Sequence, residues 1–354
     1  MDFGIALATH ADSWRHVKRA EELGYTGASF FDTQLLNADV FVAMGAAAMM
    51  TKTIKLMTGV LIPSNRIAPV AASALGSLNA LAPGRIEFGI STGFTGRRTM
   101  GLKRVKLADM KEYIRVVQAL LAGETTEWSF EGQKKKIRFL NPEIGAINIK
   151  DRIPLYISAT GPNSRKLVAE LGAGWICPVG NPQLGVNAMA DMKKQWQAAG
   201  RDVKDLHTIA EIGGCVLKEG EAADSPRVKD QAGPSAIMLA HDWVEHDQFG
   251  SAHGAMPPPL APYVERYKKV YEKFEPADAR YLMNHRGHLM FLKPEERDIV
   301  DANMIRTFSW TAPKAELQDR LRILRDAGFH HVSVQIRHNI PEMVEEWWGV
   351  FKGV

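Results

Sequence analysis

Apolar runs rich in β-branched residues alternate along the chain with segments whose apolar positions recur every three or four residues. The N-terminal pair shows the pattern: Phe3–Ala8 is an apolar run, and Trp14, Val17, Ala20 and Leu23 then follow at helical spacing. Short apolar runs of this kind predict buried strands, and the helical spacing predicts amphipathic helices. The alternation continues to the C-terminus.

The pattern predicts eight strands, each followed by helical material. The predicted strands are Phe3–Ala8, Thr26–Phe31, Ile54–Ile62, Arg85–Ser91, Pro154–Ala159, Gly174–Pro178, His207–Leu217 and His330–Ile336. The predicted helices are a segment capped by Asp12 that ends near Gly24, then Asp39–Met50, Ala68–Leu81, Lys106–Leu121, Asn163–Leu171, Pro182–Ala199, Pro313–Ala327 and a short helix from Pro341. The polar stretch Thr126–Asn148 is predicted to contain a hairpin.

Strands that alternate with helices predict a parallel sheet with right-handed crossovers, and eight such units match a closed (β/α)8 TIM barrel. An open doubly wound sheet is the alternative. We predict one domain, residues 1–354, with an insertion at 218–310 between strand seven and the last helix. Helical patterns near Tyr263–Phe274 and Pro294–Met304 lie in it. Such a connection would shape the active-site face of a barrel.

Composition and charge narrow the possible partners. Hydrophobic residues make up 45% and charged residues 24% of the chain, which is typical of a well-packed globular protein. The formal net charge of +4, with one short basic run at Lys134–Lys136, is too small to predict nucleic-acid binding. Two cysteines without a CxxC pair, Cys177 and Cys215, argue against a disulfide framework and a cysteine-based zinc site. Without a signal-peptide pattern or a long apolar run, we expect a cytoplasmic protein with no membrane partner.

Short polar residues and glycines close three of the predicted strands. Thr58-Gly59-Val60 ends strand three, Ser91-Thr92-Gly93 ends strand four, and Ser158–Asn163 leads from strand five into a helix. In a parallel barrel these ends share one face, and a helix N-terminus attracts anions. Together they favour a large phosphate-bearing cofactor, although ordinary βα turns also favour glycine, serine and threonine. The glycines around Gly93 lack the GxGxxG spacing, so no dinucleotide fingerprint is predicted.

Side chains near the other strand ends are candidates for chemistry. Asp32 and Thr33 close strand two, and His10 closes strand one. Asp32 either hydrogen-bonds a cofactor ring or holds a turn. His10 and Thr33 are candidates for proton handling, although a lone histidine is more often structural.

The insertion and the loop after strand four add four more candidates. His285 and His288 lie three residues apart, but no acid at matching spacing accompanies them, so we predict no metal site. We expect His285 to position the substrate and His288 to handle a proton. Arg97 and Arg98 are expected either to meet an anionic substrate or cofactor tail or to face water. Small-residue faces on the helices Asp39–Met50 and Ala68–Leu81 are expected to form a homodimer contact.

Three segments, residues 54–93, 155–182 and 309–335, resemble the bacterial luciferase-like superfamily of flavin and deazaflavin enzymes. The most specific piece is the predicted third helix followed by GRIEFGISTG. The resemblance is closest to the branch that contains methylene-tetrahydromethanopterin reductase and other coenzyme F420-dependent oxidoreductases. It implies hydride transfer between F420 or FMN and a small organic substrate. It also implies a non-proline cis peptide bond at Gly59–Val60.

Carried over position by position, the resemblance implies a set of cofactor contacts. Asp32, Thr58, Gly59 and Val60 would line the ring, Ser91, Thr92 and Gly93 would lie beside it, and Thr160, Gly161, Pro162 and Asn163 would hold the phosphate. The proton-transfer residues of the family do not carry over. Thr33 stands where many F420 enzymes have histidine, no carboxylate lies near Ala6, and the loop Phe94–Arg98 lacks an acid.

Two other functions stay open from the sequence. One is a monooxygenase that uses reduced FMN, which would need a flavin reductase as partner and a closed apolar cavity. The other is a non-catalytic flavin-binding protein, which the missing acids favour.

Overall fold

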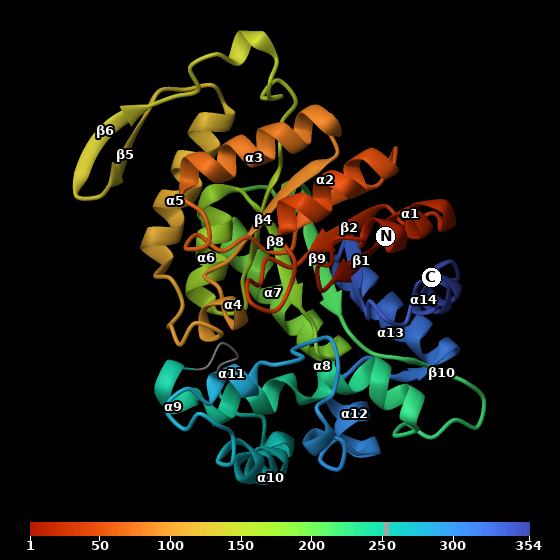
Figure 1. Cartoon of the computed structure of the whole chain (residues 1–354). Helices are drawn as coiled ribbons and strands as arrows, with labels where there is room; N and C mark the ends of the chain where they lie inside the picture. Colours follow the sequence, from red (N-terminus) through yellow and green to blue (C-terminus); the bar gives the residue numbers. More distant parts are fainter. Residues whose placement is uncertain (251–254) are drawn as a thin grey trace.

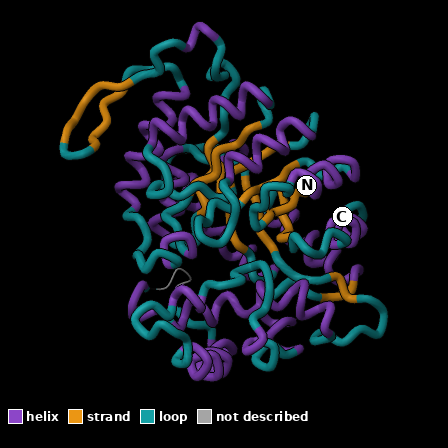
Figure 2. Tube along the Cα trace, viewed as in Figure 1, coloured by secondary structure: helices purple, strands orange, loops and turns teal. Residues whose placement is uncertain are grey.

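The computed structural model describes residues 1–250 and 255–354, and in them eight parallel strands close into a barrel surrounded by helices (Figure 1; Figure 2). The strand order around the barrel is β1-β12-β9-β8-β7-β4-β3-β2. The barrel strands are β1 (Asp2–Leu7), β2 (Gly27–Phe30), β3 (Lys55–Thr58), β4 (Ile86–Ile90), β7 (Leu155–Ser158), β8 (Gly174–Pro178), β9 (Thr208–Ile212) and β12 (His331–Ile336). Because β1 pairs with both β2 and β12, the predicted TIM barrel is confirmed and the open sheet is excluded.

Most helices cover the outside of this barrel. They are α1 (Trp14–Leu23), α2 (Val40–Met50), α3 (Ala68–Leu81), α5 (Leu107–Leu121), α6 (Pro162–Leu171), α7 (Pro182–Ala198), α13 (Lys314–Ala327) and α14 (Met343–Phe351). The short helix α4 (Thr95–Arg98) lies between β4 and α5. The antiparallel hairpin of β5 (Thr126–Phe130) and β6 (Gln133–Ile137) projects from the barrel in Figure 1, and the 3-10 turns η1 (Pro142–Ile144) and η2 (Val203–Asp205) complete this part.

Residues 218–250 and 255–310 fold against one side of the barrel (Figure 1). Their helices are α8 (Pro226–Val244), α9 (His246–Phe249), α10 (Ala261–Tyr271), α11 (Tyr281–Asn284) and α12 (Ala302–Phe308), with the 3-10 turns η3 (Pro258–Leu260) and η4 (Pro294–Glu296). A hydrophobic cluster separate from the main core joins α8, α10 and α12. The insertion therefore has a small core of its own.

Each barrel strand alternates between helix-facing and interior residues. On β4, Ile86, Phe88 and Ile90 belong to the core under the helices, whereas Met57 of β3 packs inside the barrel against Ile176 and Ile209. This alternation follows from the two-residue period of a strand. It fixes which side chains reach the barrel interior.

The amino end of the barrel interior is filled by the ring of His331. A Cβ at Gly27 would lie 2.9 Å from His331 Cε1, and one at Gly4 would collide with the same ring. Burial lowers the pKa of His331 to about 4, so the imidazole is neutral at pH 7. With this end blocked, the interior opens at the carboxyl ends of the strands.

The predicted end of the seventh strand is wrong. The strand predicted at His207–Leu217 ends at Ile212, where Gly213-Gly214 leads the chain off the barrel. A Cβ at Gly214 would collide with the backbone of Trp310, so only glycine lets these segments approach. Residues Val216–Leu217 (β10) pair instead with β11 (Ala312–Pro313).

The cap of α1 and the helices of the insertion also differ from prediction. The residue at the start of α1 is Ser13 rather than Asp12, and its Oγ accepts a hydrogen bond from His10 N at 2.9 Å. The 19-residue helix α8 was not predicted, because it contains Pro234. The pattern at Pro294–Met304 forms only η4 and the start of α12. Within the described residues, no helix combines the length and apolar character needed to cross a bilayer.

Candidate active site

A cavity of about 720 Å³ lies at the carboxyl ends of the barrel strands. Its volume is within the range of small-molecule sites. Of the residues predicted from the sequence, those that line it are Asp32, Thr33, Gly59, Val60, Ser91, Thr92, Gly93, Thr160, Gly161, Pro162, Asn163 and His288. The three glycine-bearing strand ends therefore meet in one cavity, while their contacts with a cofactor stay a prediction.

The peptide bond between Gly59 and Val60 is cis, as the resemblance implied. Both residues line the cavity directly after β3. Thr58, which precedes them, is fully buried and does not line it. Its Oγ1 donates a hydrogen bond to Gly89 O at 2.7 Å and accepts one from Gly89 N at 3.0 Å. The expected ring contact of Thr58 is thus replaced by a link between β3 and β4.

Asp32 borders the cavity but its carboxylate is already engaged. Arg66 Nη1 lies 2.8 Å from Asp32 Oδ1, and Asn65 Nδ2 and Ile62 N donate to Oδ2 at 3.1 and 3.3 Å. These contacts tie the end of β2 to the segment between β3 and α3. Asp32 therefore holds the cavity wall next to Gly59–Val60.

The N-terminus of α6 forms another side of the cavity. The N-cap residue is Gly161, and its N–H donates to Ser164 Oγ at 3.2 Å. Pro162 occupies the first turn, where its missing N–H costs nothing. The first N–H groups of a helix have no partner inside it, so those of Asn163 and Ser164 can donate to an anion. This is the arrangement that a phosphate group requires.

The sequence of residues 4–331 matches the model of the luciferase-like monooxygenase family. The chain belongs to this family. It is 30% identical over 212 residues to a 5,10-methylenetetrahydromethanopterin reductase of Methanolobus tindarius, which covers 59% of the chain and 63% of that protein. It is 33% identical over 145 residues to an F420-dependent glucose-6-phosphate dehydrogenase of Beutenbergia cavernae, covering 39% and 41% of the two chains. The match thus spans less than two thirds of either relative.

Solved structures share the luciferase-like fold along the whole chain. The F420-dependent tetrahydromethanopterin reductase of Methanopyrus kandleri superposes with a TM-score of 0.72 at 21% identity, covering 98% of this chain and 97% of the other. A type II Baeyer–Villiger monooxygenase from Pseudomonas putida in complex with FMN gives a TM-score of 0.67 at 12% identity, covering 99% and 95%. At such identities the likeness shows the fold alone.

Besides Thr58, four predicted site residues of this luciferase-like chain do not line the cavity, and His10 is one of them. Its ring stacks on His338 with centroids 3.6 Å apart. Burial is the largest cause that lowers the pKa of His10, and the nearby His338 lowers it further. His10, Asp12 and His338 are the one group of metal-ligand type among the described residues, with ligand atoms within 4.8 Å of one another.

Arg97, Arg98 and His285 are the other three. Arg97 Nε donates to Lys103 O at 2.9 Å on the rim. Arg98 is buried, and its guanidinium lies 2.9 Å from Asp242 Oδ1 on α8. His285 is fully buried, with Nε2 2.9 Å from a carboxylate oxygen of the insertion, Glu245 Oε2. Arg98 and His285 therefore join the barrel rim to the insertion, so the expectation that they bind substrate is wrong.

His288 is the one predicted site residue of the insertion that lines the cavity. Its Nε2 lies 3.0 Å from Thr95 Oγ1 of α4. Burial is the largest cause that lowers the pKa of His288 well below its usual value, and the nearby His285 and His241 lower it further. The ring is therefore neutral at pH 7 and can offer a hydrogen bond, but not the charge of an imidazolium.

Sequence reasoning missed several lining residues, among them Glu211 on β9, Gln335 on β12 and the rim residues Lys103 and Arg104. Burial raises the pKa of Glu211 to about 7. A signal for this residue was present, because Glu211 is a lone acid between apolar residues near the end of a predicted strand. The rim residues carried no comparable signal.

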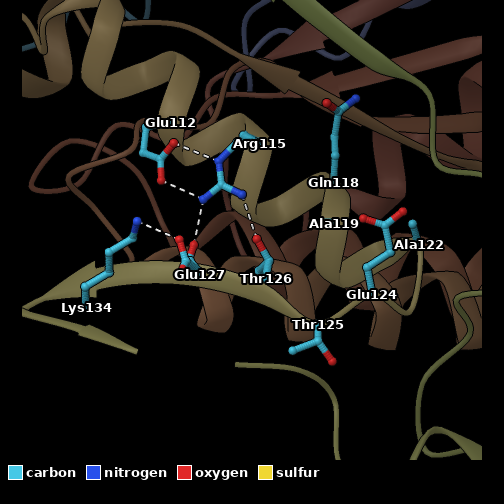
Figure 3. Close-up of a pocket in the computed structure, with 10 residues that line it drawn as sticks. All are labelled: Glu112, Arg115, Gln118, Ala119, Ala122, Glu124, Thr125, Thr126, Glu127 and Lys134. Atoms are coloured by element: carbon cyan, nitrogen blue, oxygen red, sulfur yellow. Dashed lines mark hydrogen bonds and ion pairs between the residues drawn. The ribbon is translucent and has the colours of Figure 1, made fainter. Parts of the chain in front are cut away.

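A second hollow of about 700 Å³ lies on the outside of the barrel between α5 and the β5–β6 hairpin (Figure 3). Figure 3 shows Glu112 paired with Arg115 and Glu127 paired with Lys134. Arg115 Nη2 lies 2.7 Å from Glu112 Oε1, and Lys134 Nζ lies 2.6 Å from Glu127 Oε2. It is remote from the strand ends, and we use it below as a control position.

Proposed function

We propose that this chain is an oxidoreductase that transfers a hydride between coenzyme F420 or FMN and a small organic substrate. The observation that carries the proposal is one cavity bordered by the cis peptide Gly59–Val60 and by the N-terminus of α6. The backbone at Gly59–Val60 offers a flat wall to a ring system, and the N-terminus of α6 offers N–H donors to a phosphate. The relatives named above, two F420-dependent enzymes among them, support the same reaction class.

The residues present fit such a cofactor. Val60, Ser91 and Thr92 would lie along the ring, and the segment Thr160–Asn163 would border the phosphate, with the backbone N–H groups of Asn163 and Ser164 as donors. A bound deazaflavin or flavin supplies the hydride chemistry. The chain contributes orientation, through rigid strand ends, and partial exclusion of water by the insertion. F420 is the first candidate because the curated relatives named above include an F420-dependent enzyme.

A reduced-FMN monooxygenase is the second candidate, and the FMN-bound structural neighbour favours it. Such an enzyme would depend on a separate flavin reductase for its reduced cofactor. Phe31, Phe94 and Phe249 line the cavity and provide apolar surface near the ring position, which a monooxygenase needs to keep water from a reactive oxygen adduct. Titration with each cofactor distinguishes the two candidates.

Replacement of Ser91 by phenylalanine is expected to block cofactor binding. Ser91 is half-buried on the cavity wall, and its Oγ donates to Ser158 O at 3.1 Å, so a larger side chain would fill the space beside the ring. We expect the affinity for F420, or for FMN, to fall about 100-fold, which corresponds to about 2.7 kcal/mol of binding free energy. Quenching of cofactor fluorescence during titration measures it.

Gln118→Phe in the hollow of Figure 3 is the matched control, because it adds the same side chain at an exposed position outside the site. It should bind the cofactor like the wild-type protein. Thermal melting of both variants checks that they remain folded. Unchanged binding by Ser91→Phe, or wild-type protein that binds neither cofactor, would contradict the proposed function.

We also propose that α2 and α3 form a contact between two copies of the chain. Of the small residues on which the sequence prediction of this contact rested, Ala47, Ala71 and Ala72 are buried within one chain, whereas Ala46 and Ala74 are partly exposed. The support comes from apolar side chains on the outer faces of these helices, with Val42 65% and Val70 49% exposed. Figure 1 shows the two helices side by side on the outside of the barrel.

Val42→Glu combined with Val70→Glu is expected to convert a dimer to a monomer of 39.2 kDa, because charges in an apolar contact are costly. Light scattering coupled to size-exclusion chromatography gives the mass. Ile323→Glu, at a 46% exposed position on α13, is the control and should leave the mass unchanged. A wild-type protein that elutes as a monomer at micromolar concentration would rule the contact out.

A further inference from the structure

The luciferase-like cavity contains an acidic side chain without an ion-pair partner. Glu211 lies in β9, where its neighbours Ala210 and Ile212 point outward into the core under the helices. The strand period therefore directs Glu211 inward, and it lines the cavity. Its Oε1 is shielded from solvent and has no hydrogen-bond partner among the described residues. The other acid of the cavity wall, Asp32, is paired with Arg66.

The position of Glu211 is fixed by the barrel itself. Its backbone oxygen accepts a hydrogen bond from Val179 N at 2.9 Å, and in the ladders it pairs with Pro178 of β8 and Ser333 of β12. β9 is four strands from β3 in either direction around the barrel. The carboxyl group therefore faces the cis peptide Gly59–Val60 across the cavity.

Among the described residues, none neutralises the charge of Glu211 as Arg66 neutralises that of Asp32. Burial is what raises the pKa of the Glu211 carboxyl to about 7. The titratable neighbour on β8 is Cys177, whose own pKa burial raises to about 12, and the residues of β12 beside it, Ser333 and Gln335, are uncharged. The other titratable groups that line the same cavity are Asp32, Lys103, Arg104 and His288.

We propose that Glu211 is the residue that gives a proton to the substrate, and takes it back in the reverse reaction. This inference rests on the proposed function. In the reducing direction, a deazaflavin or flavin held along Val60, Ser91 and Thr92 would supply the hydride for a new C–H bond at a C=O or C=N carbon. The oxygen or nitrogen, which receives the π electron pair, would take the proton from the Glu211 carboxyl. The reduced cofactor would give up one hydride and one proton overall, and this proton would restore the Glu211 carboxyl, so charge and atoms balance.

The assignment accounts for a gap in the sequence. The acids and the histidine that the resemblance led us to seek are absent at Ala6, Thr33 and Phe94–Arg98. Glu211 comes from a different strand and reaches the same cavity. A general acid works best when its pKa lies near the working pH, which a buried and unpaired glutamate satisfies. The substrate class is therefore a small molecule with a polar double bond that accepts both a hydride and a proton.

Glu211→Gln and Glu87→Gln form the test pair. Glu87 is also in the barrel, burial also raises its pKa to about 7, and it does not line the cavity. In protein that carries ¹³C-labelled glutamate, NMR should show two side chains that titrate near pH 7, and each variant should lack one of them. Addition of F420 or FMN should shift the titration of Glu211 and leave that of Glu87 in place.

Turnover gives the second measurement. Glu211→Gln is expected to lower kcat by about 100-fold to 10,000-fold, the usual contribution of a general acid, and Glu87→Gln to leave it unchanged. The rate of substrate reduction by the wild-type enzyme should fall as the pH rises through about 7, and this fall should be absent in Glu211→Gln.

The outcomes separate the two proposals. Undiminished turnover by Glu211→Gln, with the wild-type pH profile, overturns the role of Glu211 and leaves the proposed function standing. If no substrate is turned over, the titration decides: a Glu211 side chain that ionises near pH 4.5, or that ignores the bound cofactor, overturns the assignment. A titration near pH 7 that the cofactor shifts supports it.

Discussion

Arg98→Ala is expected to lower the free energy of unfolding by about 3–5 kcal/mol, although the residue lies in a rim loop next to the active site. Its guanidinium is 3% exposed, and both carboxylates near it, Asp242 and Glu245, are fully buried. Removal of the cation would take away the guanidinium that lies 2.9 Å from Asp242 Oδ1 and 3.6 Å from Glu245 Oε2 in the interior of the protein. The desolvation cost of these carboxylates would then no longer be offset by this arginine.

The geometry around Arg98 shows why its removal should affect the fold of the whole rim. Nη2 lies 2.9 Å from Asp242 Oδ1, Nη1 lies 3.6 Å from Glu245 Oε2, and Nη2 also donates to Gly250 O at 2.5 Å. The guanidinium stacks over Phe94, 4.2 Å from its centroid. A single side chain of α4 thus connects the barrel rim to α8 and to the segment after α9.

Urea unfolding followed by circular dichroism measures the loss, and Arg97→Ala is the matched control. Arg97 is the adjacent residue of the same short helix, half-buried, and its Nε donates only to the backbone of Lys103. Its removal should cost no more than about 1 kcal/mol, as for most surface positions. Equal losses in the two variants would show that the Arg98 ion pair is not the source of the stability.

A neutral replacement of the whole cluster provides an independent check. The triple variant Arg98→Met, Asp242→Asn, Glu245→Gln removes all three charges together and should recover much of the stability that Arg98→Ala loses. His285 would keep a hydrogen-bond acceptor from the glutamine at position 245. If the triple variant is as unstable as Arg98→Ala, shape rather than charge at position 98 is responsible.

The elements that the sequence predicts well are those in which local pattern and tertiary packing agree. The helix Ala68–Leu81 has the predicted bounds, since an apolar face, Pro69 in its first turn and Pro83 after it all favour the same ends. The helix α8 was not predicted, because Gly233 and Pro234 inside it break the local pattern. Contacts of α8 with α10 and α12 stabilise it despite these residues.

The cavity was predicted to the extent that it depends on the strand ends. Gly59–Val60 and Thr160–Asn163 were found because the carboxyl ends of parallel strands share one face of the barrel. Arg98 and His285 were misplaced because the sequence does not show that the carboxylates of Asp242 in α8 and of Glu245 just after it, 144 and 40 residues away, reach them. When its buried partner is not known, a charged residue close to a glycine-rich strand end looks like a residue that binds a ligand.

Relative to the wild-type protein, Glu211→Gln is expected to gain about 3 kcal/mol of unfolding free energy as the pH rises from about 4.5 to about 8. Burial raises the pKa of Glu211 from 4.5 to about 7 in the folded chain. A raised folded-state pKa gives stability that is fully present below pH 4.5 and is lost as the pH rises through about 7. Glutamine does not titrate, so the variant keeps what the wild type loses.

The difference between two proteins is the right measure, because buried histidines act in the opposite direction. Burial lowers the pKa of both His241 and His331 from 6.5 to about 4. Their contribution is present above pH 6.5 and is lost as the pH falls through about 4, so it masks the glutamate effect in a single stability curve. It cancels when the two curves are subtracted, since both proteins contain the same histidines.

Glu87→Gln should show a rise of similar size over the same pH window, because burial raises the pKa of Glu87 to about 7 as well. The double variant should show the sum of the two, since the residues lie on β4 and β9 and share no hydrogen bond among the described contacts. Urea titrations at several pH values, without cofactor, give all four curves. A flat difference for Glu211→Gln would mean that Glu211 is ionised in the folded protein at pH 5, and the cavity would then hold a fixed negative charge instead of a proton.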